Sequence, residues 1–205
     1  MTSLKIVLLA VLSPRRTFHG SLKGPSFREA LIGSLSILIL STAILFLVSL
    51  INSNIDAAAR DLARGTTIPF LRLLYLLGWL LFLGYAALIR FGAFLVLGET
   101  GPLLKTSVLL TFVATIPLML EGLLVGLLMS FATAISNQFS GQLLTVWISI
   151  LLFFAALTWE GFIFVRGSIA LIGQNTGRAV LCWLLPILSA LVVALVVFQI
   201  RILML

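Results

Sequence analysis

Apolar side chains occur in five long runs, each of about 20 residues or more, and short polar stretches separate these runs. The apolar residues within a run do not alternate with polar ones, as the strands of a membrane barrel would require over segments of about ten residues. A helix needs about 20 apolar residues to cross roughly 30 Å of hydrocarbon. The pattern therefore predicts an all-α fold, a membrane bundle of five transmembrane helices.

The pattern also places the connections between the helices. Crossings are expected at residues 30–51, 68–97, 107–131, 143–165 and 179–200. The second is longer than an upright helix needs, so it is expected to tilt or to bend at Gly92. Oppositely charged pairs at helical spacing in segment 55–67 predict a short polar helix or loop outside the bilayer. Segment 166–178 is expected to be a connector, and residues 1–205 form a single domain.

Residues 1–28 precede the first crossing and have a different pattern. An apolar stretch at residues 4–12 is followed directly by Pro14 and two arginines, without the small-residue cleavage site of a signal peptide. We expect a short helix here that lies along the inner membrane surface and is anchored by basic residues. The basic residues of this segment are Lys5, Arg15, Arg16, Lys23 and Arg28.

Composition supports a membrane location: 61% of the residues are hydrophobic and only 9% are charged. The net charge of +7 does not indicate nucleic acid, because the cations lie mostly at the ends of apolar runs, where they suit lipid headgroups. The lipid bilayer is the expected partner of these cations. With a cytoplasmic N-terminus, most of the cations lie on the inner side of the membrane. They are Lys5, Arg15, Arg16, Lys23, Arg28, Arg90, Lys105, Arg166 and Arg178. The chain is thus expected to begin in the cytoplasm and to end on the opposite side.

The motif inventory gives no indication of catalysis. The sequence contains no HExxH, no GxSxG and no Gly-rich phosphate loop. With one cysteine and one histidine it offers no CxxC metal site and no multi-histidine site, so no cofactor and no metal are expected. The single cysteine, Cys182, is interpreted as a buried packing residue. The sequence predicts a non-enzymatic protein.

Two acidic residues, Glu121 and Glu160, lie inside predicted crossings, where charge is costly and each becomes a candidate functional residue. Glu121 follows Pro117 by one turn, and the missing N–H of Pro117 leaves the carbonyl of Val113 unpaired and favours a kink. Two interpretations stay open. A protonated Glu121 binds a proton, a solute or a partner helix, or else Glu121 is a structural carboxyl paired with Arg72 or with a backbone carbonyl.

Glu160 lies about 8 Å from the inner end of its crossing, and Arg90 is expected at a similar depth. We expect a structural ion pair between them, at a depth from which both side chains can reach the inner interface. Trp159 and Trp183 lie within a turn or two of the same surface, as in an aromatic belt.

Gly122 and Gly126 form a GxxxG pattern directly after Glu121. Small residues at this spacing let two helices approach closely. Packing within the chain and contact with another subunit are both open at this point.

Short motifs recur along nearly the whole chain in a fixed order. They are Leu12-Ser13-Pro14-Arg15-Arg16-Thr17-Phe18, Pro25-Ser26-Phe27, Gly78-Trp79, the turn at 98–105, Thr115-Ile116-Pro117, Trp147 and Arg178-Ala179. Their order and spacing resemble prokaryotic Yip-family proteins, which are similar to the eukaryotic Ypt/Rab-interacting membrane proteins. The resemblance implies five transmembrane helices and a cytoplasmic N-terminus and, for the eukaryotic members, a role in membrane organisation or trafficking; the prokaryotic members have no settled activity. Eukaryotic members act through prenylated GTPases and sister membrane proteins. The chain lacks their long polar N-terminal domain, which argues against GTPase binding.

These observations lead to one hypothesis and one alternative. The chain is expected to organise or scaffold other membrane components, or to be an accessory subunit of a larger membrane complex, with other membrane proteins or a second copy as partners. The alternative is a small transporter or channel that uses Glu121 near the Pro117 kink. A water-filled cavity at Glu121 would favour transport, whereas a dry bundle with Glu121 hydrogen-bonded inside would favour the scaffold.

Overall fold

The computed structural model describes residues 3–19, 26–56, 62–135 and 139–203, and every regular element among them is an α-helix. The helices are α1 (Ser3–Leu12), α2 (Pro14–His19), α3 (Phe27–Asp56), α4 (Leu62–Val96), α5 (Leu103–Ala114), α6 (Ile116–Ile135), α7 (Phe139–Ile172) and α8 (Thr176–Leu203). Within these residues, five stretches are long and apolar enough to cross a membrane: Phe27–Leu45, Leu76–Val96, Leu103–Leu128, Leu144–Ile172 and Thr176–Gln199. The predicted fold class is confirmed, and the chain is a multi-pass membrane protein.

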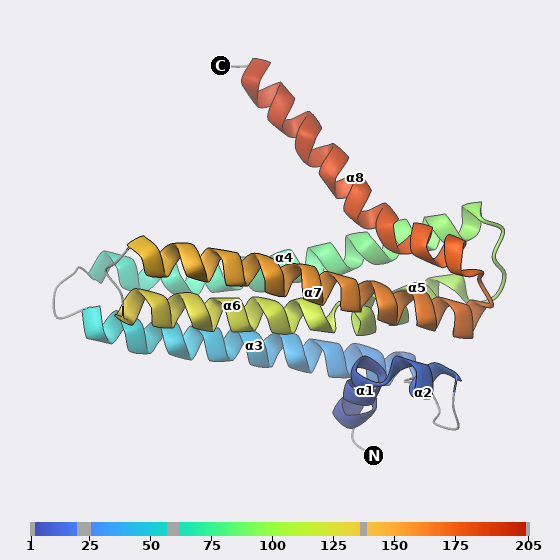
Figure 1. Cartoon of the computed structure of the whole chain (residues 1–205), viewed down its shortest axis with the longest axis horizontal. Helices are drawn as coiled ribbons and strands as arrows, with labels where there is room; N and C mark the ends of the chain where they lie inside the picture. The colour runs from blue at the N-terminus through green and yellow to red at the C-terminus, as the bar shows by residue number, and fades with distance from the viewer. Residues whose placement is uncertain (1–2, 20–25, 57–61, 136–138, 204–205) are drawn as a thin grey trace.

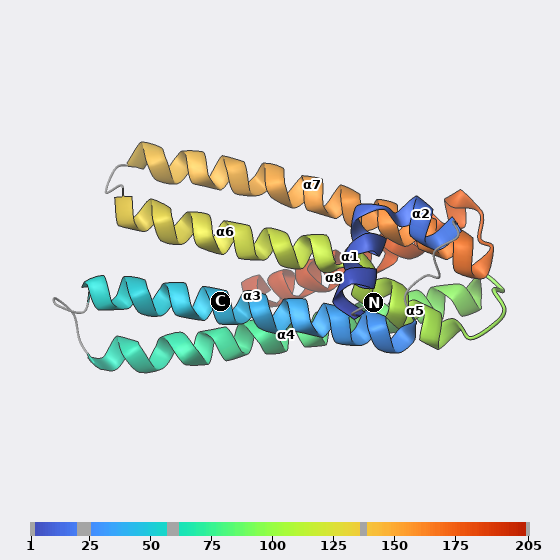
Figure 2. The ribbon, with the colours of Figure 1, turned by 90° about the horizontal axis from the view of Figure 1, so that it is seen from below.

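The long helices run up and down beside one another (Figure 1). Helix α6 packs against α3 and α7, while α8 packs against α4 and α7. Helices α1 and α2 lie at one end of the bundle, and Figure 2 shows α1 lying crosswise to α3. We call this the α1 end; α3 and α8 begin there, and α4 and α7 end there. At the opposite end, α3 and α6 end while α4 and α7 begin.

The helices extend further at their polar ends than predicted. Helix α3 reaches Asp56 and α4 begins at Leu62, so the described part of segment 55–67 belongs to these two helices and is not a separate polar helix or loop. Residues 57–61 and the charge pairs that they carry lie outside the described residues. Helix α7 likewise continues to Ile172, through most of a stretch expected to be a connector. The reason is that an established helix gains one backbone hydrogen bond for each further residue that it fixes.

The third crossing is interrupted at one residue, Thr115, between α5 and α6. Its backbone N–H still donates to the carbonyl of Thr111 at 3.1 Å, and the N–H of Met119 donates to the carbonyl of Thr115 at 3.1 Å. Pro117 therefore lies in the first turn of α6, where a missing N–H costs least. The interruption lies where the proline predicted a kink, but it is short. In the second crossing, α4 passes through Gly92 as one helix.

Glycines with positive φ form the turns between α4 and α5 and between α7 and α8, at the α1 end. Gly98 and Gly101 have φ of 73° and 109° in the turn between α4 and α5, and Gly173 has φ of 76° at the end of α7. Only glycine adopts these values without steric cost. Helix α8 then begins with a cap, because the side-chain oxygen of Asn175 accepts the N–H of Arg178 at 2.9 Å. These short connections hold the ends of four helices together.

The larger apolar core also lies at the α1 end. It includes buried residues of α1, α3, α4, α5, α7 and α8, among them Val7, Ile37, Phe94, Leu110, Phe164 and Cys182. The cysteine is free and buried, as expected. A second, smaller core lies further along the bundle and consists of Leu38, Leu83 and Met119 with partly buried neighbours.

Candidate functional site

A buried ion pair joins α4 to α7 at the α1 end. A guanidinium nitrogen of Arg90 lies 2.9 Å from a carboxylate oxygen of Glu160, and their side chains are only 2% and 3% exposed. The predicted pair is therefore present. Both side chains are enclosed by protein.

Arg90 stays inside because the protein surrounds it with partners. A second guanidinium nitrogen donates to the hydroxyl of Thr111 on α5 at 3.1 Å. The guanidinium carbon lies 4.3 Å from the ring centre of Phe164, one turn beyond Glu160. A carboxylate, a hydroxyl and an aromatic face together replace the water that a charged side chain otherwise seeks. The site thus ties three helices, α4, α5 and α7, to one side chain.

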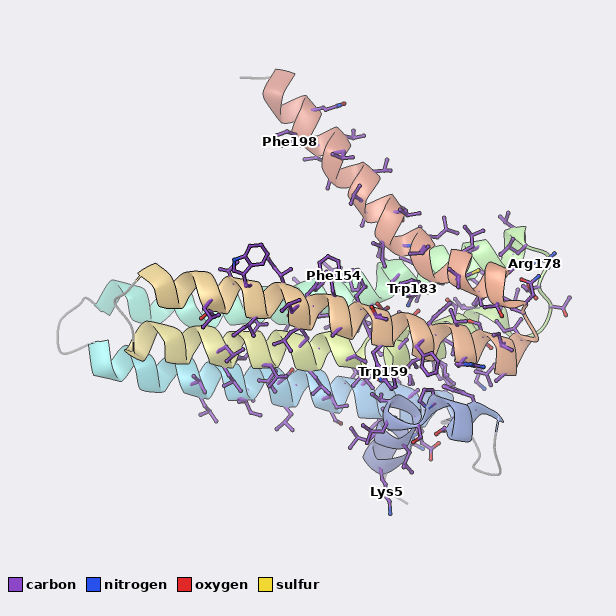
Figure 3. The ribbon with its side chains drawn as sticks, in the orientation of Figure 1. Lys5, Phe154, Trp159, Arg178, Trp183 and Phe198 are labelled. Atoms are coloured by element: carbon purple, nitrogen blue, oxygen red, sulfur yellow. The ribbon has the colours of Figure 1, made fainter. Side chains whose placement is uncertain are left out.

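Helix α1 is docked on the bundle beside this pair. The indole N–H of Trp159 on α7 donates to the carbonyl of Val11 at 2.9 Å, and Figure 3 shows Trp159 facing α1. On the α3 side, Val7 lies against Gly33, where an added Cβ would come within 2.6 Å of a Val7 methyl carbon. Helix α2 packs against α7. The predicted helix at 4–12 exists, but one of its faces is held by protein and is not free to lie on lipid.

The opposite face of α1 remains outward. Lys5 and Leu12 are exposed, and Lys5 points away from the bundle in Figure 3. Arg28 is also exposed. The side chains of Arg15 and Arg16 are not described, and Lys23 lies outside the described residues. Two of the five predicted basic residues thus form a described outward surface at the α1 end.

A close helix contact joins α7 to α8. A Cβ added to Gly161 would lie 2.8 Å from two ring carbons of Trp183, so only glycine leaves room for this indole. Trp183 therefore packs between two helices (Figure 3). Trp159 is partly exposed and stacks on Phe162.

The GxxxG pattern serves packing within the chain at one of its two positions. A Cβ added to Gly126 would lie 2.5 Å from a terminal carbon of Leu45 on α3. Gly122 is partly buried on the same helix. The interpretation as packing within the chain is supported for Gly126, and nothing ties this residue to a second subunit.

Glu121 is partly exposed on α6. The two ion pairs of the described residues, Arg90–Glu160 and Arg178–Glu99, do not include it. The side chain of Arg72, which the sequence offered as a partner, is not described. Glu121 lies one turn after Pro117 on α6, near the interruption at Thr115, and both residues are partly buried.

The structure adds residues to the site that the sequence did not single out. Thr111 and Phe164 complete the Arg90 site, and Val11 accepts the Trp159 indole. One signal was available for Phe164, because residues i and i+4 share a helix face and Glu160 precedes it by four. The carbonyl of Val11 carries no signal of its own, since every residue has one.

The chemistry of this site is binding and positioning. The charges of Arg90 and Glu160 compensate each other, and the hydrogen bond to Thr111 adds a third helix, while Arg90 Nε has no hydrogen-bond partner among the described residues. Among the residues the structure describes, no group of three His, Cys, Asp or Glu side chains could hold a metal ion. Comparisons with known protein families, with curated proteins and with solved structures find no match.

Proposed function

We propose that this chain is a non-enzymatic integral membrane protein that organises other membrane components, as a scaffold or as an accessory subunit of a larger complex. One observation carries the proposal. The last helix leaves the bundle obliquely, and the side chains of residues 190–199 are exposed on every face (Figure 1). A helix that packs only in its own chain buries at least one face, so half of α8 is available to other membrane proteins.

The spans differ in how much of each is buried inside the bundle, and the last span is buried least. In the most apolar 18-residue stretch of Leu103–Leu128, 56% of the residues are buried inside the bundle, against 11% in the corresponding stretch of Thr176–Gln199. The exposed residues of α8 include Leu191, Val193 and Phe198, which present apolar area in several directions. Contact between transmembrane helices comes from packing and interhelical hydrogen bonds and not from the hydrophobic effect. A long, uncovered helix is therefore well suited to lateral packing with a partner.

The orientation belongs to the same proposal. The described cations Lys5, Arg28, Lys105 and Arg178 lie at the α1 end, and all four are exposed. Cationic ends of transmembrane helices favour the cytoplasm, and anionic lipid headgroups attract them. We place the N-terminus in the cytoplasm and, after five crossings, the C-terminus on the other side. The α1 end then meets the inner leaflet.

The resemblance to prokaryotic Yip-family proteins supports the same function. The eukaryotic Ypt/Rab-interacting proteins, to which that family is similar, have roles in membrane organisation and bind other membrane proteins. An organiser of this kind needs a stable body and a surface left open for partners. Here the α1 end supplies the body and the distal half of α8 supplies the surface.

Photo-crosslinking in native membranes tests the proposal. A photoreactive amino acid at Val193 lies on the distal half of α8, and the same group at Leu181 is a matched control on the proximal half, since both positions are exposed and apolar. We expect a discrete protein adduct from position 193 and none from position 181. An adduct of twice the chain's own mass would identify a second copy as the partner. Absence of a protein adduct from position 193, or equal adducts from both positions, would contradict the proposal.

One observation favours a second candidate, a small transporter or channel. Helix α6 begins at an interruption, and Glu121 lies near it inside a span without a partner among the described residues. Interrupted helices are frequent at transport sites. In reconstituted vesicles, a pH-driven flux that Glu121→Gln abolishes would establish this candidate, and flux unchanged by Glu121→Gln would remove it.

A further inference from the structure

Glu121 lies at the edge of the uncovered face of α6. Leu120, Leu124 and Leu128 on this side are 37%, 50% and 37% exposed. The opposite face is turned inward, where Met119 belongs to the smaller apolar core and Gly126 lies against Leu45. The carboxyl group therefore borders the surface that lipid or another helix would cover.

The position along the span makes this carboxyl costly. Glu121 lies inside the span Leu103–Leu128, about 10 Å along the helix from Leu128, and α6 continues beyond Leu128 to Ile135. A lone carboxylate at this depth is unfavourable, and acidic residues inside membranes pair with one another or with a donor. The described part of this chain supplies no such donor.

We propose that this edge of α6 binds a transmembrane helix of another protein, and that this helix carries a lysine or arginine at the depth of Glu121. The inference rests on the proposed organising function and names the chemistry of one partner. Charge complementarity selects the partner, since a cation on a facing helix neutralises the carboxylate and donates to it in one contact.

A second copy of the chain fits less well. A two-fold axis along the membrane normal keeps each residue at its own depth and brings like surfaces together. The exposed cations of the described residues, among them Lys5, Arg28 and Lys105, lie at the α1 end, far from Glu121 along the bundle. Two copies related in this way would bring the two Glu121 carboxyls to the same depth, without an exposed cation of the described residues between them.

The test uses two synthetic transmembrane peptides of leucine and alanine in phosphatidylcholine vesicles that hold the full chain. One peptide has a single lysine about 10 Å from one end of its apolar stretch, and the other has leucine there. Energy transfer between labelled chain and labelled peptide measures binding. We expect the lysine peptide to bind the wild type about tenfold more tightly than Glu121→Gln, the size of one interhelical hydrogen bond to a charged group.

Three further variants sharpen the result. Glu99→Gln removes one carboxylate from the turn at the α1 end and is expected to bind like the wild type. Glu121→Lys is expected to lose the lysine peptide and to bind a peptide with glutamate at the same position. Arg72→Met is expected to bind like the wild type, whereas stronger binding would reveal a pair inside the chain and overturn the proposal.

Two outcomes separate this inference from the function on which it rests. Equal binding of the lysine peptide by wild type and Glu121→Gln overturns the docking site, even where Val193 crosslinks to a partner protein and the organising function stands. A proton flux that Glu121→Gln abolishes overturns it in favour of transport.

Discussion

The two ends of the bundle are built differently. At the α1 end, two short helices, two glycine turns and the Arg90–Glu160 pair hold the long helices around the larger core. Further along the bundle, the described side chains form a smaller cluster around Leu38, Leu83 and Met119, and α8 has left the bundle. One chain therefore contains a region that packs closely on itself and, in the distal half of α8, a helix whose faces are all exposed. The difference indicates where this protein supplies its own contacts and where other molecules supply them.

The contrast also separates structural from functional polar residues. Both Glu160 and Glu121 are carboxyl groups inside spans, but Glu160 is buried and paired, whereas Glu121 is partly exposed at the edge of α6. Compensation within the chain makes the first a structural element. The role of Glu121 depends on which molecule covers this side of α6.

The largest expected effect comes from breaking the buried pair. Arg90→Met or Glu160→Leu alone leaves one uncompensated buried charge, which costs about 3–5 kcal/mol of stability. The double variant removes both charges and should recover most of this loss. Unfolding in detergent, followed by tryptophan fluorescence, measures all three variants. A double variant as unstable as either single one would show that the two side chains do not stabilise the fold as a pair.

Matched glycine substitutions compare the two ends next. Gly161→Ala places a methyl group against the rigid ring of Trp183 and should cost about 1–3 kcal/mol of unfolding free energy. Gly126→Ala meets only the flexible end of Leu45, in the less densely packed region, and gains helix propensity. It should change stability by less than about 1 kcal/mol. Equal losses in the same unfolding assay would mean that both ends are packed alike.

A smaller effect is expected at α1. Trp159→Phe removes the hydrogen bond to the carbonyl of Val11 and should weaken the docking of α1 by about 1 kcal/mol. Hydrogen exchange of the α1 backbone amides measures this opening. Trp147→Phe is the control, because Trp147 is largely exposed on the first half of α7, and it should leave the exchange of α1 unchanged. Faster exchange in both variants would indicate a general loss of stability.

Much of this fold could be predicted from the sequence because every backbone N–H and C=O group in hydrocarbon needs a hydrogen-bond partner within the protein, and a helix supplies it. The apolar runs predicted the five crossings. The similar depths expected for Arg90 and Glu160 in their crossings predicted the ion pair between them. The helix ends were missed by up to seven residues, as at Ile172 in α7, because a helix that is already formed continues through Arg166, Gly167 and Ser168 into a further apolar stretch. The start of α3 carried a clearer signal, since Ser26 and Glu29 exchange capping hydrogen bonds of 2.8 and 3.3 Å.

The contacts between segments distant in sequence could not be predicted in the same way. The docking of α1 depends on a backbone carbonyl and on the space beside Gly33, and Trp183 faces Gly161 because α8 packs along α7. Such contacts follow from tertiary packing. The departure of α8 is likewise invisible in its sequence, because an apolar run has the same composition whether protein or lipid surrounds it.

An oxygen-accessibility scan of α8 tests the central claim, that its distal half is uncovered by its own chain. Spin labels are placed singly at residues 176–199 in a Cys182→Ala background, with one chain per lipid nanodisc. We expect oxygen accessibility to fall to minima every three to four residues, near the buried residues Ala179, Cys182 and Pro186. Over residues 190–199 we expect high accessibility without minima. Minima continuing at the same period to residue 199 would show that α8 packs along the whole bundle, and would contradict the account.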